Sequence, residues 1–146
     1  MTDSRELKLL DSNILIYAYD RSEAKKHATA KELVKERWKK EDSVLSIQIL
    51  AEFYSVITSK IERPLEIDKA KQIVLDYIDG FEILRYNEKT IVEAINVQAI
   101  YKIPFWDALI VATMEENSID SIITENEKDF KKVKWVKIVN PFGKSG

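Results

Sequence analysis

Hydrophobic residues recur along the chain in two patterns that alternate from one end to the other. Short apolar runs predict strands at residues 7–10, 44–47, 81–84, 121–124 and 133–139. Longer stretches with apolar residues at helical spacing predict helices at residues 22–40, 48–61, 66–78, 88–101 and 105–117. Because parallel strands need crossover connections, this alternation predicts an α/β fold, a three-layer α/β/α arrangement around a mostly parallel central sheet.

Composition and charge narrow the class of protein. The 146 residues, of which 45% are hydrophobic, suffice for a single domain over residues 1–146. The 23 Lys and Arg nearly balance the 25 Asp and Glu, so binding to nucleic acid needs local patches or metal ions. With no cysteine and one histidine, His27, the chain excludes a Cys-ligated zinc and a multi-histidine metal site. The chain begins without a signal peptide and has no apolar stretch of the about 20 residues that span a bilayer, so we expect a soluble, cytoplasmic protein.

Three acidic residues stand at positions where the pattern predicts the interior or the edge of the sheet. Asp11 directly follows the first predicted strand. Glu52 lies at helical spacing from Ile49 and Val56, on the helix face that is predicted to be buried. Asp107 is the only charge in the segment FWDALIVATM, which is predicted to be a central helix. Burying an ionised carboxylate is costly unless it is paired or bound to a cation, so these acids need partners.

Two explanations for the acids remain open at this point. Each could be salt-bridged separately or cap a helix, and Asp107 would be favoured by the helix dipole if its helix starts near Phe105. Alternatively, the acids could bind Mg²⁺ or Mn²⁺ together, because these hard cations prefer oxygen ligands. A site of this kind serves phosphodiester hydrolysis, in which the metal activates water and stabilises charge on the phosphate without histidine or cysteine.

Five segments, LLDSNILIYAYD, ILAEFYSVI, IPFWDALIVATM, IITEN and IVNPF, follow one another between Leu9 and Phe142. In this order they resemble the PIN-domain ribonucleases, most closely the VapC-type toxins of toxin–antitoxin pairs. The resemblance implies an endoribonuclease that binds Mg²⁺ or Mn²⁺ through Asp11, Glu52 and Asp107. It also implies that Asn13 supports the first of these acids.

The chain departs from that family after the fourth predicted strand. Many members have an Asp at the end of a Thr/Ser-Glu-Asp arrangement, whereas this chain has Thr124-Glu125-Asn126. Asn126 could ligate the metal through its carbonyl oxygen or hold a metal-bound water, but it adds no charge, which leaves one or two metal ions open. Glu125, Glu127 or Asp129 could take its place if the loop is shifted; otherwise they are surface acids.

The resemblance also implies partners: an RNA substrate, a small antitoxin protein that enters the acidic site, and a second copy of the chain. The apolar segment at residues 14–20 is the expected dimer contact. The lysine-rich segment at residues 128–137 could lie along an RNA backbone, with Trp135 as a stacking surface. It could equally be an edge strand whose lysines prevent pairing with other chains.

Two other functions compete with the nuclease. A catalytically weak PIN domain could act as an RNA- or protein-binding module, which Asn126 makes conceivable. A receiver or a haloacid-dehalogenase-like phosphatase would also carry an aspartate after its first strand. The phosphatase pattern needs a second Asp where Asn13 stands, however, and neither alternative explains Glu52 or Asp107.

Overall fold

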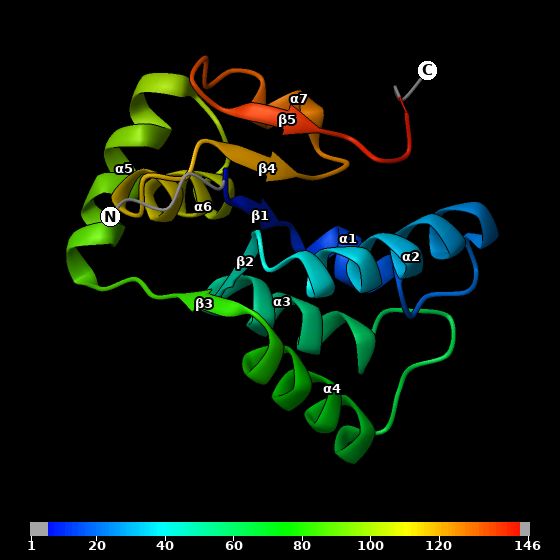
Figure 1. Cartoon of the computed structure of the whole chain (residues 1–146). Helices are drawn as coiled ribbons and strands as arrows, with labels where there is room; N and C mark the ends of the chain where they lie inside the picture. The colour runs from blue at the N-terminus through cyan, green and yellow to red at the C-terminus, as the bar shows by residue number, and fades with distance from the viewer. Residues whose placement is uncertain (1–5, 144–146) are drawn as a thin grey trace.

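The sheet is built from five short strands that run parallel throughout. A computed structural model describes residues 6–143 of the chain. The strands lie in the order β3-β2-β1-β4-β5, and each pairs with its neighbours in parallel (Figure 1). Their bounds are β1 Lys8–Leu10, β2 Ser43–Ser46, β3 Glu82–Leu84, β4 Ser121–Ile123 and β5 Lys137–Val139. The predicted α/β architecture with a parallel sheet is confirmed.

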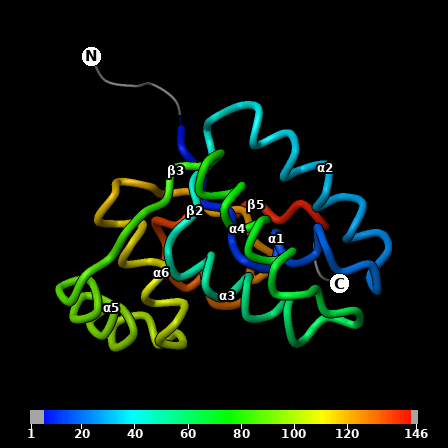
Figure 2. Tube along the Cα trace, turned by 90° about the horizontal axis from the view of Figure 1, so that it is seen from below, coloured from blue at the N-terminus to red at the C-terminus, as the bar shows by residue number. Residues whose placement is uncertain are grey.

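Seven helices connect these strands within the described part of the chain. They are α1 Ser12–Tyr17, α2 Ala24–Lys40, α3 Ile47–Ile57, α4 Ile67–Gly80, α5 Glu88–Tyr101, α6 Phe105–Glu116 and α7 Glu127–Phe130. Helix α1 packs against α2 and α3, α3 packs against α4, and α5 packs along α6 (Figures 1 and 2). The chain crosses the sheet in one direction through α1–α4 and in the other through α5–α7, so right-handed crossovers place the two groups on opposite faces.

The core lies between the sheet and these helices. Helix α6 is buried from Ala108 to Met114 without interruption, as its apolar sequence predicts for a central helix. On the other side, the indole of Trp38 in α2 packs against Tyr77 and lies over Gly80. A Cβ at Gly80 would come within 2.2 Å of that ring, so a larger residue there would force the two helices apart.

Two predicted boundaries were wrong for local reasons. Ile47 begins α3 instead of ending β2, because the Ser46 hydroxyl accepts the backbone N–H of Ile49 (3.2 Å) and caps the helix. The same helix ends at Ile57 instead of residue 61. There the hydroxyl of Thr58 donates to the carbonyl of Tyr54 (2.8 Å), a contact that competes with continuation of the helix.

The predicted last strand was too long. Only Lys137–Val139 forms β5, although Val133 and Val136 are buried, so the apolar alternation before residue 137 comes from turns packed on the core. β5 is an edge strand, as one interpretation expected, but only one of the lysines belongs to it. That residue, Lys137, forms ion pairs with Asp120 (3.3 Å) and Glu6 (3.5 Å).

The first two residues of the expected dimer contact at residues 14–20 lie inside the protein. Ile14 and Leu15 of α1 are fully buried in the protein's own core and are not available to a second chain. Exposed apolar side chains lie instead on α4 and α5, among them Ile78, Val92 and Ile95. No helix in residues 6–143 is long and apolar enough to cross a membrane.

Candidate active site

The candidate site lies where the strand order reverses. β1 stands between β2 and β4, so the chain leaves β1 towards one side of the sheet and returns through β4 on the other. In open parallel sheets, ligands bind at the carboxyl ends of the strands at this position. Asp11 follows β1 there, and Thr124 follows β4 directly beside it.

Asp11 is held in one orientation by three hydrogen bonds. As the N-cap of α1, its Oδ1 accepts the backbone N–H of Ser12 (2.7 Å), while its Oδ2 accepts the Thr124 hydroxyl (2.7 Å) and the Asn13 amide (3.3 Å). Only 5% of the residue is exposed. Burial raises the pKa of Asp11, and the three hydrogen bonds oppose part of that rise. The carboxylate is therefore fixed and desolvated before any ligand binds.

Glu52 faces Asp11 from the opposite helix, α3. The residue is half-buried, and its Oε2 lies 3.5 Å from the side-chain nitrogen of Gln48, one turn earlier. Burial and the charge of Asp11 together raise the pKa of Glu52. Glu52 thus lies on the inward face of its helix, as its spacing predicts.

Asp107 belongs to the first turn of α6, as one of the open explanations supposed. The favourable helix dipole does not dominate its electrostatics, however. Burial, then the neighbouring Asp129, then the charge of Asp11 raise the pKa of Asp107 to about 7. Being at a helix N-terminus therefore does not by itself account for this carboxylate.

Asn126 connects Asp107 to a fourth acid. Its amide nitrogen lies 3.3 Å from Asp107 Oδ2 and 3.4 Å from Asp129 Oδ2, and its oxygen caps α7 by accepting the backbone N–H of Asp129 (3.4 Å). Of the three acids left open as substitutes, Asp129 is therefore the one that the structure brings to Asp107. Helix α7 was not predicted from the apolar pattern, although an Asn followed three residues later by an acid is typical of helix starts.

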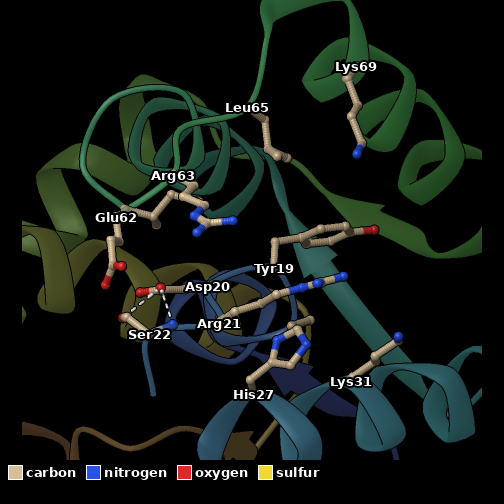
Figure 3. Close-up of a pocket in the computed structure, with 12 residues that line it drawn as sticks. Tyr19, Asp20, Arg21, Ser22, His27, Lys31, Glu62, Arg63, Leu65 and Lys69 are labelled. Atoms are coloured by element: carbon tan, nitrogen blue, oxygen red, sulfur yellow. Dashed lines mark hydrogen bonds between the residues drawn. The ribbon is translucent and has the colours of Figure 1, made fainter. Parts of the chain in front are cut away.

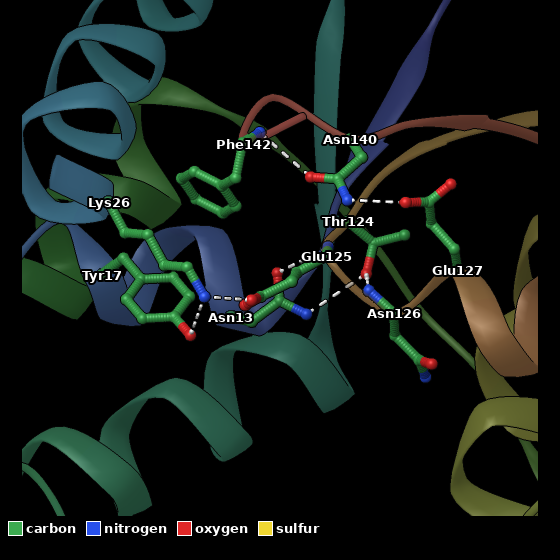
Figure 4. A network of polar contacts seen from close by, with 9 residues as sticks. All are labelled: Asn13, Tyr17, Lys26, Thr124, Glu125, Asn126, Glu127, Asn140 and Phe142. Atoms are coloured by element: carbon green, nitrogen blue, oxygen red, sulfur yellow. Dashed lines mark hydrogen bonds and ion pairs between the residues drawn. The ribbon is translucent and has the colours of Figure 1, made fainter. Parts of the chain in front are cut away.

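The other two acids near β4 have different partners (Figure 4). Glu125 pairs with Lys26 of α2, whose ammonium group also lies 3.5 Å from the hydroxyl of Tyr17. Glu127 accepts the side-chain amide of Asn140 (2.8 Å). These contacts hold the segment after β4 against the neighbouring elements, so Glu125 and Glu127 have structural roles in this arrangement.

Two further side chains organise the site and were given no role from the sequence. Thr124 is fully buried, and besides donating to Asp11 its hydroxyl accepts the backbone N–H of Asn126 (2.9 Å). Gln48 is buried as well, and its amide donates to the carbonyl of Trp106 (2.9 Å), which ties α3 to the start of α6. The sequence feature that could have identified Thr124 is its position directly after a buried strand, where the strand order reverses.

The donor set fits a hard divalent cation in its chemistry. Within residues 6–143, no lysine or arginine forms an ion pair with Asp11, Glu52 or Asp107. The buried Oε1 of Gln48 also has no hydrogen-bond partner in this region, as expected of a group that meets a ligand or its water. As the side chains stand, no three acids of the described residues converge closely enough to bind one ion. A cation would thus have to draw together carboxylates that now repel one another.

A family model for the PIN domain matches residues 8–136 of the chain. The chain belongs to the PIN-domain family. The PIN-domain match spans all the residues placed in the candidate site and ends just before β5.

Solved structures share the fold of this PIN domain at low sequence identity. A toxin–antitoxin complex from Klebsiella pneumoniae has 22% identity and a TM-score of 0.67, with 92% of this chain and 97% of that chain covered. The DNA-bound VapBC from Salmonella typhimurium has 17% identity and a TM-score of 0.67, with 92% and 98% covered. The sarcin–ricin loop cleaving toxin VapC20 from Mycobacterium tuberculosis has 15% identity and a TM-score of 0.66, with 88% and 96% covered. No curated protein sequence matches the chain.

Proposed function

We propose that this PIN domain is a Mg²⁺- or Mn²⁺-dependent endoribonuclease that hydrolyses phosphodiester bonds at Asp11, Glu52 and Asp107. The observation that carries the proposal is that these three acids are wholly or half-buried and that the charge of Asp11 acts on both of the others, with no ion-paired cation in the described residues. Burial raises the pKa of all three carboxylates, and the charge of Asp11 raises those of Glu52 and Asp107 further. A bound divalent cation would relieve both effects.

In this proposal each side chain of the site has its own role. Asp11, Glu52 and Asp107 hold the ion, while Asn126 contributes its amide oxygen or holds a water, with Asp129 as an additional acid. Thr124 and Asn13 keep Asp11 in the orientation required for binding. When bound, such an ion lowers the pKa of a water and stabilises charge on the phosphate oxygens. The expected products carry a 3′-hydroxyl and a 5′-phosphate.

An exposed aromatic ring beside the acids supports a nucleic-acid substrate. Trp106 precedes Asp107 and is 60% exposed, although a tryptophan usually buries most of its surface. Its ring meets that of Phe105 at 73°, with 5.2 Å between centroids, and more than half of the residue's surface stays exposed. Nucleobases stack on rings in such positions, and stacking favours single-stranded RNA over a duplex.

We further propose that the chain is the toxin of a toxin–antitoxin pair and forms a homodimer. The support is the shared fold with a toxin–antitoxin complex and with VapBC, together with the exposed apolar side chains on α4 and α5. An antitoxin would be a small protein that covers the acidic site. Co-expression with the short protein encoded by a neighbouring gene tests this, because the antitoxin should co-purify and suppress cleavage.

The nuclease is tested by incubating purified protein with total cellular RNA and Mn²⁺. Wild type should cleave, and Asp11→Asn should not, since it keeps the shape of the side chain but loses a charged ligand. Asp68→Asn removes the same charge from an exposed position on α4 and should cleave as wild type does. EDTA should abolish cleavage. A 2′,3′-cyclic phosphate at the product ends would contradict the mechanism, because it marks attack by the ribose 2′-hydroxyl.

The second candidate function is an RNA- or protein-binding module. The observation that favours it is Asn126, which brings an amide instead of a fourth charge to Asp107. If wild type and Asp11→Asn both bind RNA but neither cleaves it with Mg²⁺ or Mn²⁺, this function replaces the nuclease.

A further inference from the structure

A cavity of about 620 Å³ opens at the far end of α1 from Asp11 (Figure 3). It lies between the segment joining α1 to α2 and the segment joining α3 to α4. Its walls carry cationic and aromatic side chains that the site at Asp11 does not use: Tyr19, Arg21, His27, Lys31, Arg63 and Lys69. We call this cavity the basic pocket. Its volume is in the range of pockets that bind small organic ligands.

The basic pocket has an excess of positive charge. Arg21, Lys31, Arg63 and Lys69 line it against two acids, Asp20 and Glu62. None of the four cations forms an ion pair within residues 6–143. Asp20, in contrast, already accepts the hydroxyl (2.7 Å) and the backbone N–H (3.1 Å) of Ser22. The pocket therefore offers cationic groups without internal partners, which suits an anionic ligand.

Rings lie among these cations. The Tyr19 side chain projects into the pocket between Arg63 and Arg21, and the imidazole of His27 lies below them (Figure 3). His27 Nδ1 lies 2.9 Å from the carbonyl oxygen of Tyr17, which can only accept, so Nδ1 carries the hydrogen and Nε2 is left for a ligand. Cationic groups beside flat rings match the two parts of a nucleotide, its phosphate and its base.

The position of the basic pocket relates it to the candidate active site. α1 has six residues, so the pocket begins on the order of 10 Å along the helix axis from Asp11. The acids at Asp11 repel a polyanion, and the chain as a whole carries a net charge of −2, so a nucleic acid needs cationic contacts nearby. The pocket supplies them within reach of a short oligonucleotide.

From these observations we propose that the basic pocket binds a nucleotide of the RNA strand whose scissile phosphate lies at Asp11. Arg21 and Arg63 contact the phosphate, and Tyr19 and His27 face the base. The inference rests on the proposed function in taking RNA as the strand, but the binding itself needs neither metal nor cleavage.

The test is binding of a fluorescent twelve-nucleotide single-stranded RNA in EDTA, measured by anisotropy over a range of salt concentrations. The double variant Arg21→Ala/Arg63→Ala should bind roughly tenfold more weakly than wild type at low salt. The slope of log affinity against log salt should fall by about 1.4, as expected for two lost contacts to a single strand. Both side chains are exposed, so melting temperatures should match and the loss is not one of folding.

A control variant with the same change of charge is Lys35→Ala/Lys39→Ala, on exposed positions of α2 outside the pocket. It should keep the affinity and most of the salt slope. A loss as large as that of the pocket variant would show a nonspecific charge effect and overturn the proposal. A loss of RNA affinity in Lys131→Ala/Lys134→Ala, but not in the pocket variant, would also overturn the proposal. It would assign RNA binding to the lysine-rich segment before β5.

Competition with uridine 5′-monophosphate distinguishes a strand from a free nucleotide. Weak competition, at concentrations far above the affinity of the RNA, supports a strand that binds beyond the pocket as well. Competition at equal affinity would assign the pocket to free nucleotides and overturn the proposal, as would equal RNA affinity of wild type and pocket variant. The outcome is independent of the nuclease test: loss of binding without any cleavage supports the pocket alone, and cleavage with unchanged binding supports the nuclease alone.

Discussion

Asp107 lies near two other acids, Asp11 and Asp129, and accepts a hydrogen bond from the neutral side-chain amide of Asn126. With a pKa of about 7, its carboxyl is partly protonated at neutral pH in the absence of metal. Metal binding must then release that proton, because only the ionised group is a ligand. Affinity for Mn²⁺ is therefore expected to fall as the pH decreases below 7, well above the ordinary range of an aspartate.

Because its pKa is raised, ionisation of Asp107 lowers the stability of the folded protein. Its folded pKa of about 7 exceeds the ordinary 3.8, so ionisation opposes folding, and stability is lost as the pH rises from about 4 to about 7. In EDTA, the melting temperature of Asp107→Asn should equal that of wild type near pH 4. At pH 8 it should be higher than that of wild type. Differential scanning calorimetry across this range measures the effect. With Mn²⁺ at pH 8 the order should reverse, because only wild type binds the ion well.

The control for this experiment is Glu32→Gln, which removes an exposed charge from α2 and should follow wild type at every pH. A lower melting temperature of Asp107→Asn in EDTA throughout the range would contradict the argument. It would mean that the carboxylate forms a stabilising ion pair in the folded chain.

At the scale of elements, the pattern of the sequence predicted most of the fold because each strand and helix buries one continuous apolar surface. The apolar pattern predicted the buried stretch of α6 and the inward face of α3 directly. These two predictions located Asp107 and Glu52 in the interior. The short helix α7 could not be read in this way, since four residues complete only one turn. Its position depends on the cap at Asn126 and on the packing of Phe130, which is fully buried. The apolar pattern therefore left Asp129 as one of three acids that could take the place of Asn126 and did not single it out.

We expect the segment from Thr124 to α7 to affect both the stability of the fold and the affinity for a metal ion. Asn126→Asp would keep the helix cap, because aspartate caps as well as asparagine does. It would replace an amide donor by a further carboxylate, 3.3 Å from Asp107 and 3.4 Å from Asp129. We expect a lower melting temperature in EDTA and a several-fold higher affinity for Mn²⁺, measured by titration calorimetry.

Asn140→Asp provides the matched control for that substitution. It also replaces an amide that donates to an acid, Glu127, but at a contact that does not include Asp107. It should lower the melting temperature and leave the affinity for Mn²⁺ unchanged. If Asn126→Asp binds Mn²⁺ no better than wild type, then residue 126 does not face the ion and Asp129 is the better candidate for the fourth ligand.

At the scale of the whole molecule, charge and apolar surface are distributed unevenly. Asp11 and the basic pocket lie at the two ends of α1, so the RNA strand that we propose to contact both would run along this helix. The exposed apolar side chains lie on other elements, and on α5 they include Val92 and Ile95, three residues apart and 60% and 52% exposed. Residues at this spacing share one face of a helix, so α5 presents an apolar stripe to its surroundings.

This stripe on α5 is the surface on which we expect the homodimer to form. A two-fold dimer brings the same face of both copies together, so a single charge is introduced twice into the contact. Wild type should sediment at twice 17.0 kDa, and Ile95→Glu should sediment as a monomer with an unchanged circular dichroism spectrum. Ile100→Glu makes the same change on α5 about 140° around the helix, at a residue that is 69% exposed, and should remain a dimer. If Ile95→Glu is still dimeric, the contact lies elsewhere, and the exposed Leu75 and Ile78 of α4 are the next positions to change.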